Sequence, residues 1–344
     1  MRTYQLIIAY DGSRFRGWQR QPDTELTIQG ILEKQISTLV GYPVEVQGAG
    51  RTDGGVHAAA QTASIQLAGK IEPEYFREKL NQCLPEDIRV LGVKLMKNSF
   101  HARYSACGKR YEYAVDTGVR PNVFLRKYTF HYPEKLDIQK MRQAAAILEG
   151  THDFTAFTDR PDEHSARRRI YQIQITESGN LVNIKYIGSG FMYHMVRILT
   201  GTLLEVGIGK RTPENVKSLL EHGVRAEAGF LAPACGLCVK RVYYEKKSCV
   251  LYNANAEKEN FKDEISVMER KWDSRMCAKR FSGVFSENRC GRVLSAGNKD
   301  AGRAVRIRIA WILSILELCC EERVFRYSSI YQKKADQCGK WNRN

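Results

Sequence analysis

The first hundred residues alternate between strand-like and helix-like patterns of apolar positions. Large apolar residues recur at every second position from Tyr4 to Tyr10, which predicts a strand. After Thr27, a residue type that caps helices, apolar residues recur at helical spacing until Gly41, where the helix is expected to end. Further elements are predicted at 44–47 (strand), 59–67 (strand), 73–83 (helix) and 88–94 (strand). The β-α-β-β-α-β order favours an α+β unit rich in antiparallel pairing.

A similar succession of elements follows, without a residue-level repeat. Strands are predicted at 110–115, 167–175, 181–187 and 237–244. A helix capped by Asp137 is expected to end at Gly150, a second helix covers 191–206, and a third starts at Pro213. The chain therefore divides into two α/β units, at 1–105 and 106–247.

The pattern fails from Ser248 onward. Lysine and arginine number 19 there against 12 acidic residues, and only 307–318 is consistently apolar. Such a segment has little with which to build a core. We therefore predict that 248–344 is a poorly ordered extension with at most one helix.

The net charge of +16 favours a polyanionic partner such as RNA, DNA or an anionic membrane surface. The alternative is a soluble protein with an ordinary lysine-rich surface. No run approaches the ~18 apolar residues of a transmembrane helix, and the amino terminus does not have the pattern of a signal peptide. We expect a cytoplasmic protein whose ten cysteines are reduced thiols.

The stretch GAGRTDGGVHA, residues 48–58, places Arg51 and Asp53 among small residues that contribute little to a core. A carboxylate in such a loop can act as nucleophile, general base or metal ligand. A metal would need more ligands, and only His57 is near, where a structural role is favoured. Arg51 could hold Asp53 ionised or bind phosphate. A surface ion pair is the plainer alternative, but it would not require so many glycines.

Two further stretches combine aromatic, basic and apolar residues. In KRYEYAV, Lys109 and Arg110 precede Tyr111, which suits base stacking and phosphate contact, whereas Tyr113 is favoured as a core residue. In GSGFMYHMVRILTGTLLEVG, residues 188–207, Arg197 lies in an apolar helix. A buried arginine needs a partner, which a carboxylate or an RNA phosphate would supply.

Weaker signals come from a basic loop and a cysteine pair. Arg14, Arg16 and Arg20 lie around two glycines and are candidate phosphate contacts. Cys235 and Cys238 form a lone CxxC, without the second pair that a zinc site normally has, so a zinc or redox role has little support.

Together the stretches YDGSRFRGWQRQ, GAGRTDGGVHA, SFHARYSACGKRYEY, GTHDFTAF and GSGFMYHMVR resemble the tRNA pseudouridine synthase A (TruA) family, over residues 1 to 244. The resemblance implies a pseudouridine synthase fold, with two α/β subdomains, at 1–105 and 106–247, related by pseudo-twofold symmetry. Their mixed, mainly antiparallel sheets would flank a basic cleft in each copy of a homodimer. It implies isomerisation of uridine at positions 38 to 40 of the tRNA anticodon stem-loop, without cofactor, metal or membrane. The extension 248–344 has no family counterpart.

The resemblance also assigns roles to four residues. Asp53 matches the nucleophile, and Tyr111 matches an aromatic residue packed against the target base. Arg51 matches an arginine associated with base flipping and pairing to the aspartate, and Arg197 matches a basic residue near the catalytic carboxylate. Attack at C6 of the base and a glycal route through the sugar both remain open.

Two other functions compete with this one. A non-catalytic tRNA-binding protein could keep the same scaffold, although it would have no reason to retain Asp53. A hydrolase acting on a nucleoside would need a second acid at glycosidase spacing, and none stands out.

Overall fold

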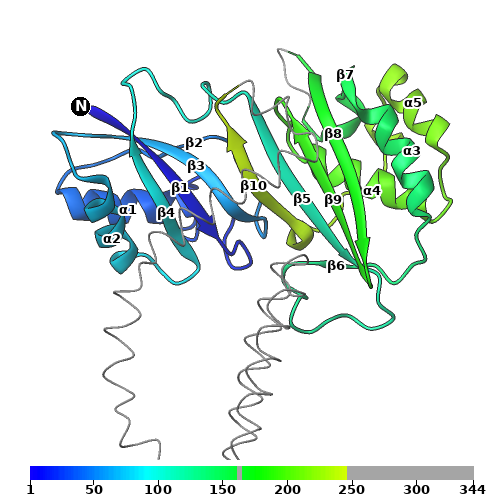
Figure 1. Cartoon of the computed structure of the whole chain (residues 1–344), viewed down its shortest axis with the longest axis horizontal. Helices are drawn as coiled ribbons and strands as arrows, with labels where there is room; N and C mark the ends of the chain where they lie inside the picture. The colour runs from blue at the N-terminus through cyan, green and yellow to red at the C-terminus, as the bar shows by residue number, and fades with distance from the viewer. Residues whose placement is uncertain (161–164, 246–344) are drawn as a thin grey trace, which may run out of the picture. The chain divides into compact units, whose positions relative to one another are not determined.

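The computed structural model describes residues 1–160 and 165–245, in which one long mixed sheet carries helices beside each end (Figure 1). The strands are β1 (Arg2–Tyr10), β2 (Gln47–Gly48), β3 (His57–Leu67), β4 (Ile88–Leu95), β5 (Gly108–Asp116), β6 (Phe130–His131), β7 (Gly150–Asp153), β8 (Arg167–Ser178), β9 (Leu181–Gly188) and β10 (Leu237–Tyr243). The α-helices are α1 (Ile28–Val40), α2 (Pro73–Cys83), α3 (Ile138–Leu148), α4 (Met195–Gly207) and α5 (Pro213–His222).

The sheet joins the two predicted units through its last strand. Its order is β4-β1-β3-β10-β5-β9-β8-β7, with β2 beside β3 and β6 beside β5. Neighbours are antiparallel except for the pairs β10–β3 and β5–β6. Because β10 lies between β3 and β5, the two halves of the chain form one continuous hydrogen-bonded layer. Figure 1 shows α1 and α2 beside β1 and β4, and α3 to α5 beside the far end of the sheet.

The helix ends confirm the capping residues expected from the sequence. The side chain of Thr27 accepts a hydrogen bond from the Gly30 amide, and Gly41 ends α1 in the left-handed conformation at φ 81°. Asp137 caps α3 in the same way, through the amide of Lys140. Local side-chain chemistry therefore fixes where these helices begin and end.

Two expected elements are shorter in the structure. The helix predicted at 191–206 begins only at Met195, because His194 has a φ of 61° and interrupts the helical backbone. The strand predicted at 44–47 pairs with β3 only at Gln47 and Gly48. The spacing of apolar residues cannot reveal that one residue has a left-handed backbone conformation. That residue, His194, lies beside the candidate site.

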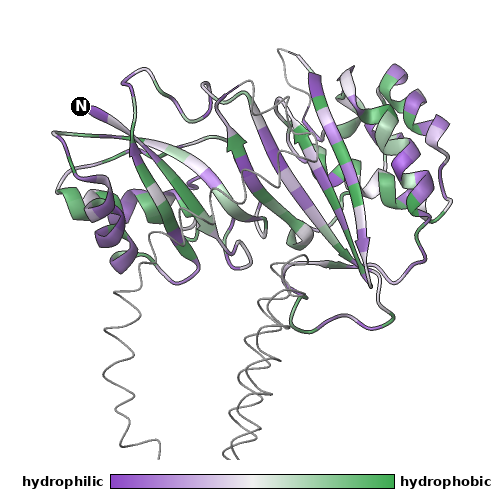
Figure 2. Cartoon of the chain, in the orientation of Figure 1, coloured by the Kyte–Doolittle hydropathy of each residue, from purple (hydrophilic) through white to green (hydrophobic). Residues whose placement is uncertain are grey.

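The core follows the alternation of the strands. Figure 2 shows apolar and polar residues alternating along β8, as expected for a strand with differently buried faces. The largest fully buried side chains include Trp18, Tyr4, Tyr113, Tyr186, Phe154 and Phe157. Tyr113 is thus the core residue that the sequence predicted, and its hydroxyl donates to the Pro233 carbonyl at 2.7 Å.

The predicted extension 248–344, including its apolar segment 307–318, lies outside the described residues. Among the helices of residues 1–160 and 165–245, none has the length and apolar character needed to cross a bilayer.

Candidate active site

Asp53 lies in the loop between β2 and β3, and its neighbour Thr52 anchors that loop. The buried Thr52 hydroxyl is 2.9 Å from the Tyr10 hydroxyl, and its carbonyl accepts from the Trp18 amide at 3.0 Å. The Asp53 carbonyl accepts from the Val56 amide at 3.2 Å, which closes a turn. These bonds fix the backbone on both sides of Asp53.

Glycines let this loop approach its neighbours closely. Gly17 has a φ of 100°, and a β-carbon there would lie 2.6 Å from the Thr52 carbonyl oxygen. A β-carbon at Gly50 would lie 2.7 Å from Nζ of Lys109 on β5. Gly17 therefore leaves no room for a side chain, and its backbone packs directly against the loop. Lys109 lies next to the loop that carries Asp53.

Arg197 of α4 is the ion-pair partner of Asp53. Its Nη1 lies 2.8 Å from Oδ2 of Asp53, and its Nε donates to the Ala232 carbonyl at 2.7 Å. The Arg197 side chain is only 13% exposed. Of the two partners that the sequence left open for this arginine, a carboxylate or an RNA phosphate, the structure shows the carboxylate of Asp53.

The expected pairing of Arg51 with Asp53 is wrong within the described residues. The side chain of Arg51 is exposed and lines the cleft, whereas the ion pairs of Asp53 are formed with Arg197 and His194. Burial explains the difference, because an exposed arginine remains hydrated while a buried one requires a counter-charge. The role of Arg51 in base flipping stays a prediction.

His194 is the residue that sequence reasoning missed. Its Nε2 lies 3.5 Å from Oδ2 of Asp53, and its Nδ1 lies 2.5 Å from Oδ2 of Asp159. Asp159 also accepts from Nε of Arg225 at 2.7 Å. The only signal in the sequence was a single histidine between apolar residues just before Arg197.

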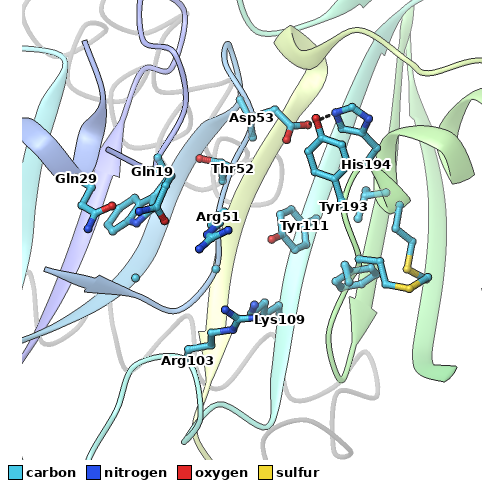
Figure 3. A pocket seen from close by; sticks show the side chains of 18 of the residues that line it. Gln19, Gln29, Arg51, Thr52, Asp53, Arg103, Lys109, Tyr111, Tyr193 and His194 are labelled. Atoms are coloured by element: carbon cyan, nitrogen blue, oxygen red, sulfur yellow. Dashed lines mark ion pairs between the residues drawn. The ribbon is translucent and has the colours of Figure 1, made fainter. Parts of the chain in front are cut away.

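Tyr111 of β5 lies beside the carboxylate. Its ring is 8% exposed and packs edge-on against Phe191, with ring centres 5.2 Å apart. Burial, and secondarily the negative charge of Asp53, raise the pKa of the Tyr111 hydroxyl well above its ordinary value, so the phenol is neutral. Figure 3 shows Tyr111 between the loop of Arg51 and Asp53 and the segment of Tyr193 and His194.

These residues line a cleft of about 970 Å³, which is large for a small-molecule pocket. Its lysines and arginines outnumber its acidic residues, Glu45 and Asp53. The basic lining residues are Arg16, Arg51, Arg103, Lys109, Arg160, Arg168 and Arg197. Burial, together with repulsion from Arg103 and Arg168, lowers the pKa of Lys109 to about 8. The cleft can therefore bind an anionic ligand and direct it toward Asp53.

Of the other basic residues predicted to contact phosphate, only some line the cleft. Arg16 lines the cleft, whereas the exposed Arg14 and Arg20 pair with Asp87 and Glu33 and are not among its lining residues. Arg110 alternates with the cleft residues Lys109 and Tyr111 along β5, and it pairs with Glu112. Any contact of Arg110 with RNA would therefore lie away from the cleft.

His57 has structural partners, as the sequence favoured. Its Nδ1 accepts from the Gly12 amide at 3.1 Å, and its Nε2 lies 2.9 Å from the Lys127 carbonyl, to which it donates. Cys235 and Cys238 are free thiols whose pKa values are raised by burial. Across residues 1–160 and 165–245, no group of three or more histidine, cysteine or acidic side chains could hold a metal ion.

A match to a family model and matches to individual proteins both give the same family. Residues 6–105 and 144–245 match the model of a family described as tRNA pseudouridine synthase. A tRNA pseudouridine synthase A of Bacillus sp. (strain KSM-64) is 41% identical over 245 residues, 71% of this chain and 100% of the relative. The enzyme of the same name from Clostridium kluyveri is 42% identical with the same coverage.

Among solved structures, the chain is similar to one in a crystal structure of a Cbf5-Nop10-Gar1 complex. The identity is 13% and the TM-score 0.27, over 69% of this chain and 48% of that chain. A score this low carries no argument about the fold.

Proposed function

The chain belongs to the tRNA pseudouridine synthase family, whose members are isomerases, and from that premise we propose the site and the residue at which it acts. The substrate uridines are those at positions 38 to 40 of the tRNA anticodon stem-loop, and Asp53 is the nucleophile. The observation that carries the assignment of Asp53 is its position, as a carboxylate paired with Arg197 in a basic cleft beside Tyr111.

The isomerisation needs no imported group. The bond between C1′ and N1 of uridine breaks, a bond between C1′ and C5 forms, and the proton lost from C5 is balanced by one gained at N1. No electrons are exchanged with another molecule. The chemistry therefore requires a group that accepts the transient charge or proton, a surface that holds the base while it turns, and exclusion of water from the intermediate.

Asp53 supplies the first of these requirements. The guanidinium of Arg197 bonds to Oδ2, while Oδ1 makes none of the hydrogen bonds or ion pairs found among the described residues. A carboxylate oxygen without a competing partner can attack C6 of the base, or it can act at the sugar in a glycal route. Both routes use the same carboxylate in the same place.

Tyr111 and the basic lining supply the surface. A uridine must leave the stack of the anticodon stem to reach Asp53, at a cost of a few kcal/mol. The edge-packed ring of Tyr111 offers a face for the extruded base, and Arg51, which lines the cleft, fills the vacated position in this proposal. The remaining basic residues of the cleft suit the phosphates of the flanking nucleotides.

The test is release of tritium from tRNA labelled at C5 of uridine, with the wild type beside Asp53→Asn. We expect release by the wild type and none above background by the variant, because the amide cannot act as a nucleophile. tRNA binding by Asp53→Asn should stay near that of the wild type. A non-catalytic tRNA-binding protein would instead bind tRNA without releasing tritium in either form.

A second tRNA substrate tests the assignment of the modified positions separately from the assignment of Asp53 as the nucleophile. A tRNA in which residues 38 to 40 carry no uridine should release no tritium, although it keeps every other labelled uridine. Release from this control would contradict the assignment to the anticodon stem-loop while leaving Asp53 as the nucleophile. The homodimer implied by the family resemblance stays a prediction, which light scattering of the purified chain would check.

A further inference from the structure

His194 occupies a strained backbone position between two carboxylates. Among the described residues it is the one non-glycine with a positive φ, 61°, and it immediately precedes α4. Residues with a β-carbon disfavour this region, so the surroundings must hold His194 there. Its side chain is 14% exposed and lies between Asp53 and Asp159. Strain that persists at such a place points to a role for the side chain.

Asp159 determines which ring nitrogen carries a proton. Burial alone would raise the pKa of the Asp159 carboxyl. The hydrogen bonds from His194 and Arg225 outweigh burial, and the pKa lies below its ordinary value. An ionised carboxylate only accepts hydrogen bonds, so the proton lies on Nδ1 of His194, 2.5 Å away. Nε2 is then the nitrogen that faces Asp53.

Aromatic stacking restricts the ring further. The Tyr193 ring stacks on the His194 ring, with centres 3.7 Å apart and planes 24° apart. Arg160 lies over the same tyrosine, 4.9 Å from its ring centre. The imidazole is therefore held at one edge by Asp159 and at one face by Tyr193. Figure 3 shows it directed at Asp53.

Both ion pairs that the Asp53 side chain forms with described residues converge on one oxygen. Nη1 of Arg197 lies 2.8 Å from Oδ2, and Nε2 of His194 lies 3.5 Å from the same atom. Two groups from the start of α4 thus define the rotation of the carboxylate, and Oδ1 is left for the substrate. A nucleophile must be aligned to within a fraction of an ångström, and a 1 Å misplacement costs about 10²-fold in rate.

We propose that His194 is a positioning residue for Asp53, which it orients through Oδ2 while Asp159 and Arg225 hold the imidazole in place. The proposal rests on the proposed function, in which Asp53 attacks the uridine. The two ring nitrogens of His194 face two carboxylate oxygens, Nδ1 that of Asp159 and Nε2 that of Asp53.

The test compares His194→Gln with His194→Asn, using turnover of tritiated tRNA by the full-length protein. Glutamine can place an amide N–H near the position of Nε2, toward Asp53, whereas asparagine reaches only the position of Nδ1. Asparagine is also the better residue for a left-handed backbone. Positioning therefore predicts that His194→Gln keeps the higher kcat, and a purely backbone role predicts the reverse order.

His194→Ala and Asp159→Ala complete the experiment. We expect His194→Ala to lower kcat by about 10- to 100-fold, with the KM for tRNA changed by less than about twofold. Asp159→Ala should lower kcat less, and the double variant should be no slower than His194→Ala, because Asp159 acts through the histidine. Additive losses, or a His194→Ala variant with kcat within about twofold of the wild type, would overturn the proposal.

The outcomes also separate this inference from the function on which it rests. If the wild type forms no pseudouridine in tRNA, the proposed function fails and the positioning role fails with it. If the wild type is active, Asp53→Asn is inactive and all variants of His194 and Asp159 keep wild-type kcat, only the positioning role fails. A loss confined to the KM for tRNA would assign His194 to RNA binding and would also contradict the proposal.

Discussion

Arg197 and Asp53 are 144 positions apart in the chain, and Nη1 of the arginine lies 2.8 Å from Oδ2 of the aspartate. The contact joins the loop after β2 to the first turn of α4, so each half of the chain contributes one partner. The sheet makes this possible, because β10 bridges β3 and β5 and fixes the two halves in one layer. The site therefore depends on the joined sheet.

Replacing Arg197 should reduce turnover more than it reduces tRNA binding. Arg197→Ala removes both the bond to Asp53 and the bond to the Ala232 carbonyl, and we expect kcat to fall by about 10²- to 10³-fold. Arg197→Lys keeps the charge but cannot make both bonds from one planar group. Its kcat should therefore lie between that of the wild type and that of Arg197→Ala. Initial rates at saturating tRNA measure the effect. Equal rates for Arg197→Lys and Arg197→Ala would show that charge contributes nothing.

Tyr111→Phe should keep more activity than Tyr111→Ala. The ring of Tyr111 packs edge-on against Phe191, and stacking of a base on an aromatic ring is worth ~1–3 kcal/mol. Phenylalanine keeps this surface, whereas alanine removes it and opens a gap beside Phe191. We expect a kcat within about tenfold of the wild type for Tyr111→Phe and a much larger loss for Tyr111→Ala. Equal losses would indicate instead that the hydroxyl transfers a proton.

The sequence predicted the parts of the site that depend on local pattern or family motifs. Caps at Thr27 and Asp137 are local, so their helices begin where the sequence placed them. Asp53, Tyr111 and Arg197 come from three separate stretches, and the structure brings them to one cleft. Burial of an arginine in an apolar helix was enough to predict that Arg197 has an anionic partner, and the family resemblance placed it near the carboxylate.

The sequence could not predict the contacts that depend on one unusual backbone angle. His194 reaches Asp159 because its φ is 61°, and no residue pattern encodes that angle for a histidine. Asp159 in turn meets Arg225, 66 positions later, through a loop contact without periodicity. The pairing of Arg51 with Asp53 was inferred from proximity along the chain and from the family resemblance. The chain instead supplies the counter-charge from α4, where burial makes a partner necessary.

The affinity for tRNA should fall as the pH rises through the pKa of Lys109. That pKa is lowered to about 8, first by burial and then by Arg103 and Arg168, so the ammonium loses its proton near pH 8 in the free protein. A phosphate beside Nζ favours the charged form, which raises the pKa in the complex, and binding then takes up a proton. Binding is strongest below pH 8 and weakens above it, by about tenfold per pH unit at most.

Fluorescence anisotropy with labelled tRNA, from pH 6.5 to 9.5 at constant salt, measures this dependence. Lys109→Arg is the matched control, because a guanidinium stays charged over the whole range and the slope above pH 8 should disappear. Lys109→Met should also remove the slope but bind more weakly at pH 7. A wild-type affinity that stays constant from pH 7 to 9.5 would place Lys109 outside the RNA contact.

A chain that ends after residue 247 should retain full activity. The curated relatives from Bacillus sp. (strain KSM-64) and Clostridium kluyveri are matched over 100% of their length by 245 residues of this chain. Every residue of the candidate site, and β10 that joins the two halves of the sheet, lies before residue 247. Removing 248–344 also removes 19 basic and 12 acidic residues, a net charge of +7, so non-specific binding should weaken most at low salt. We therefore expect kcat on tRNA within about twofold of the full-length chain at 150 mM salt, and a smaller affinity for unrelated RNA at 50 mM salt. Loss of tritium release by the shortened chain, with its unfolding transition unchanged, would show that 248–344 takes part in the reaction itself.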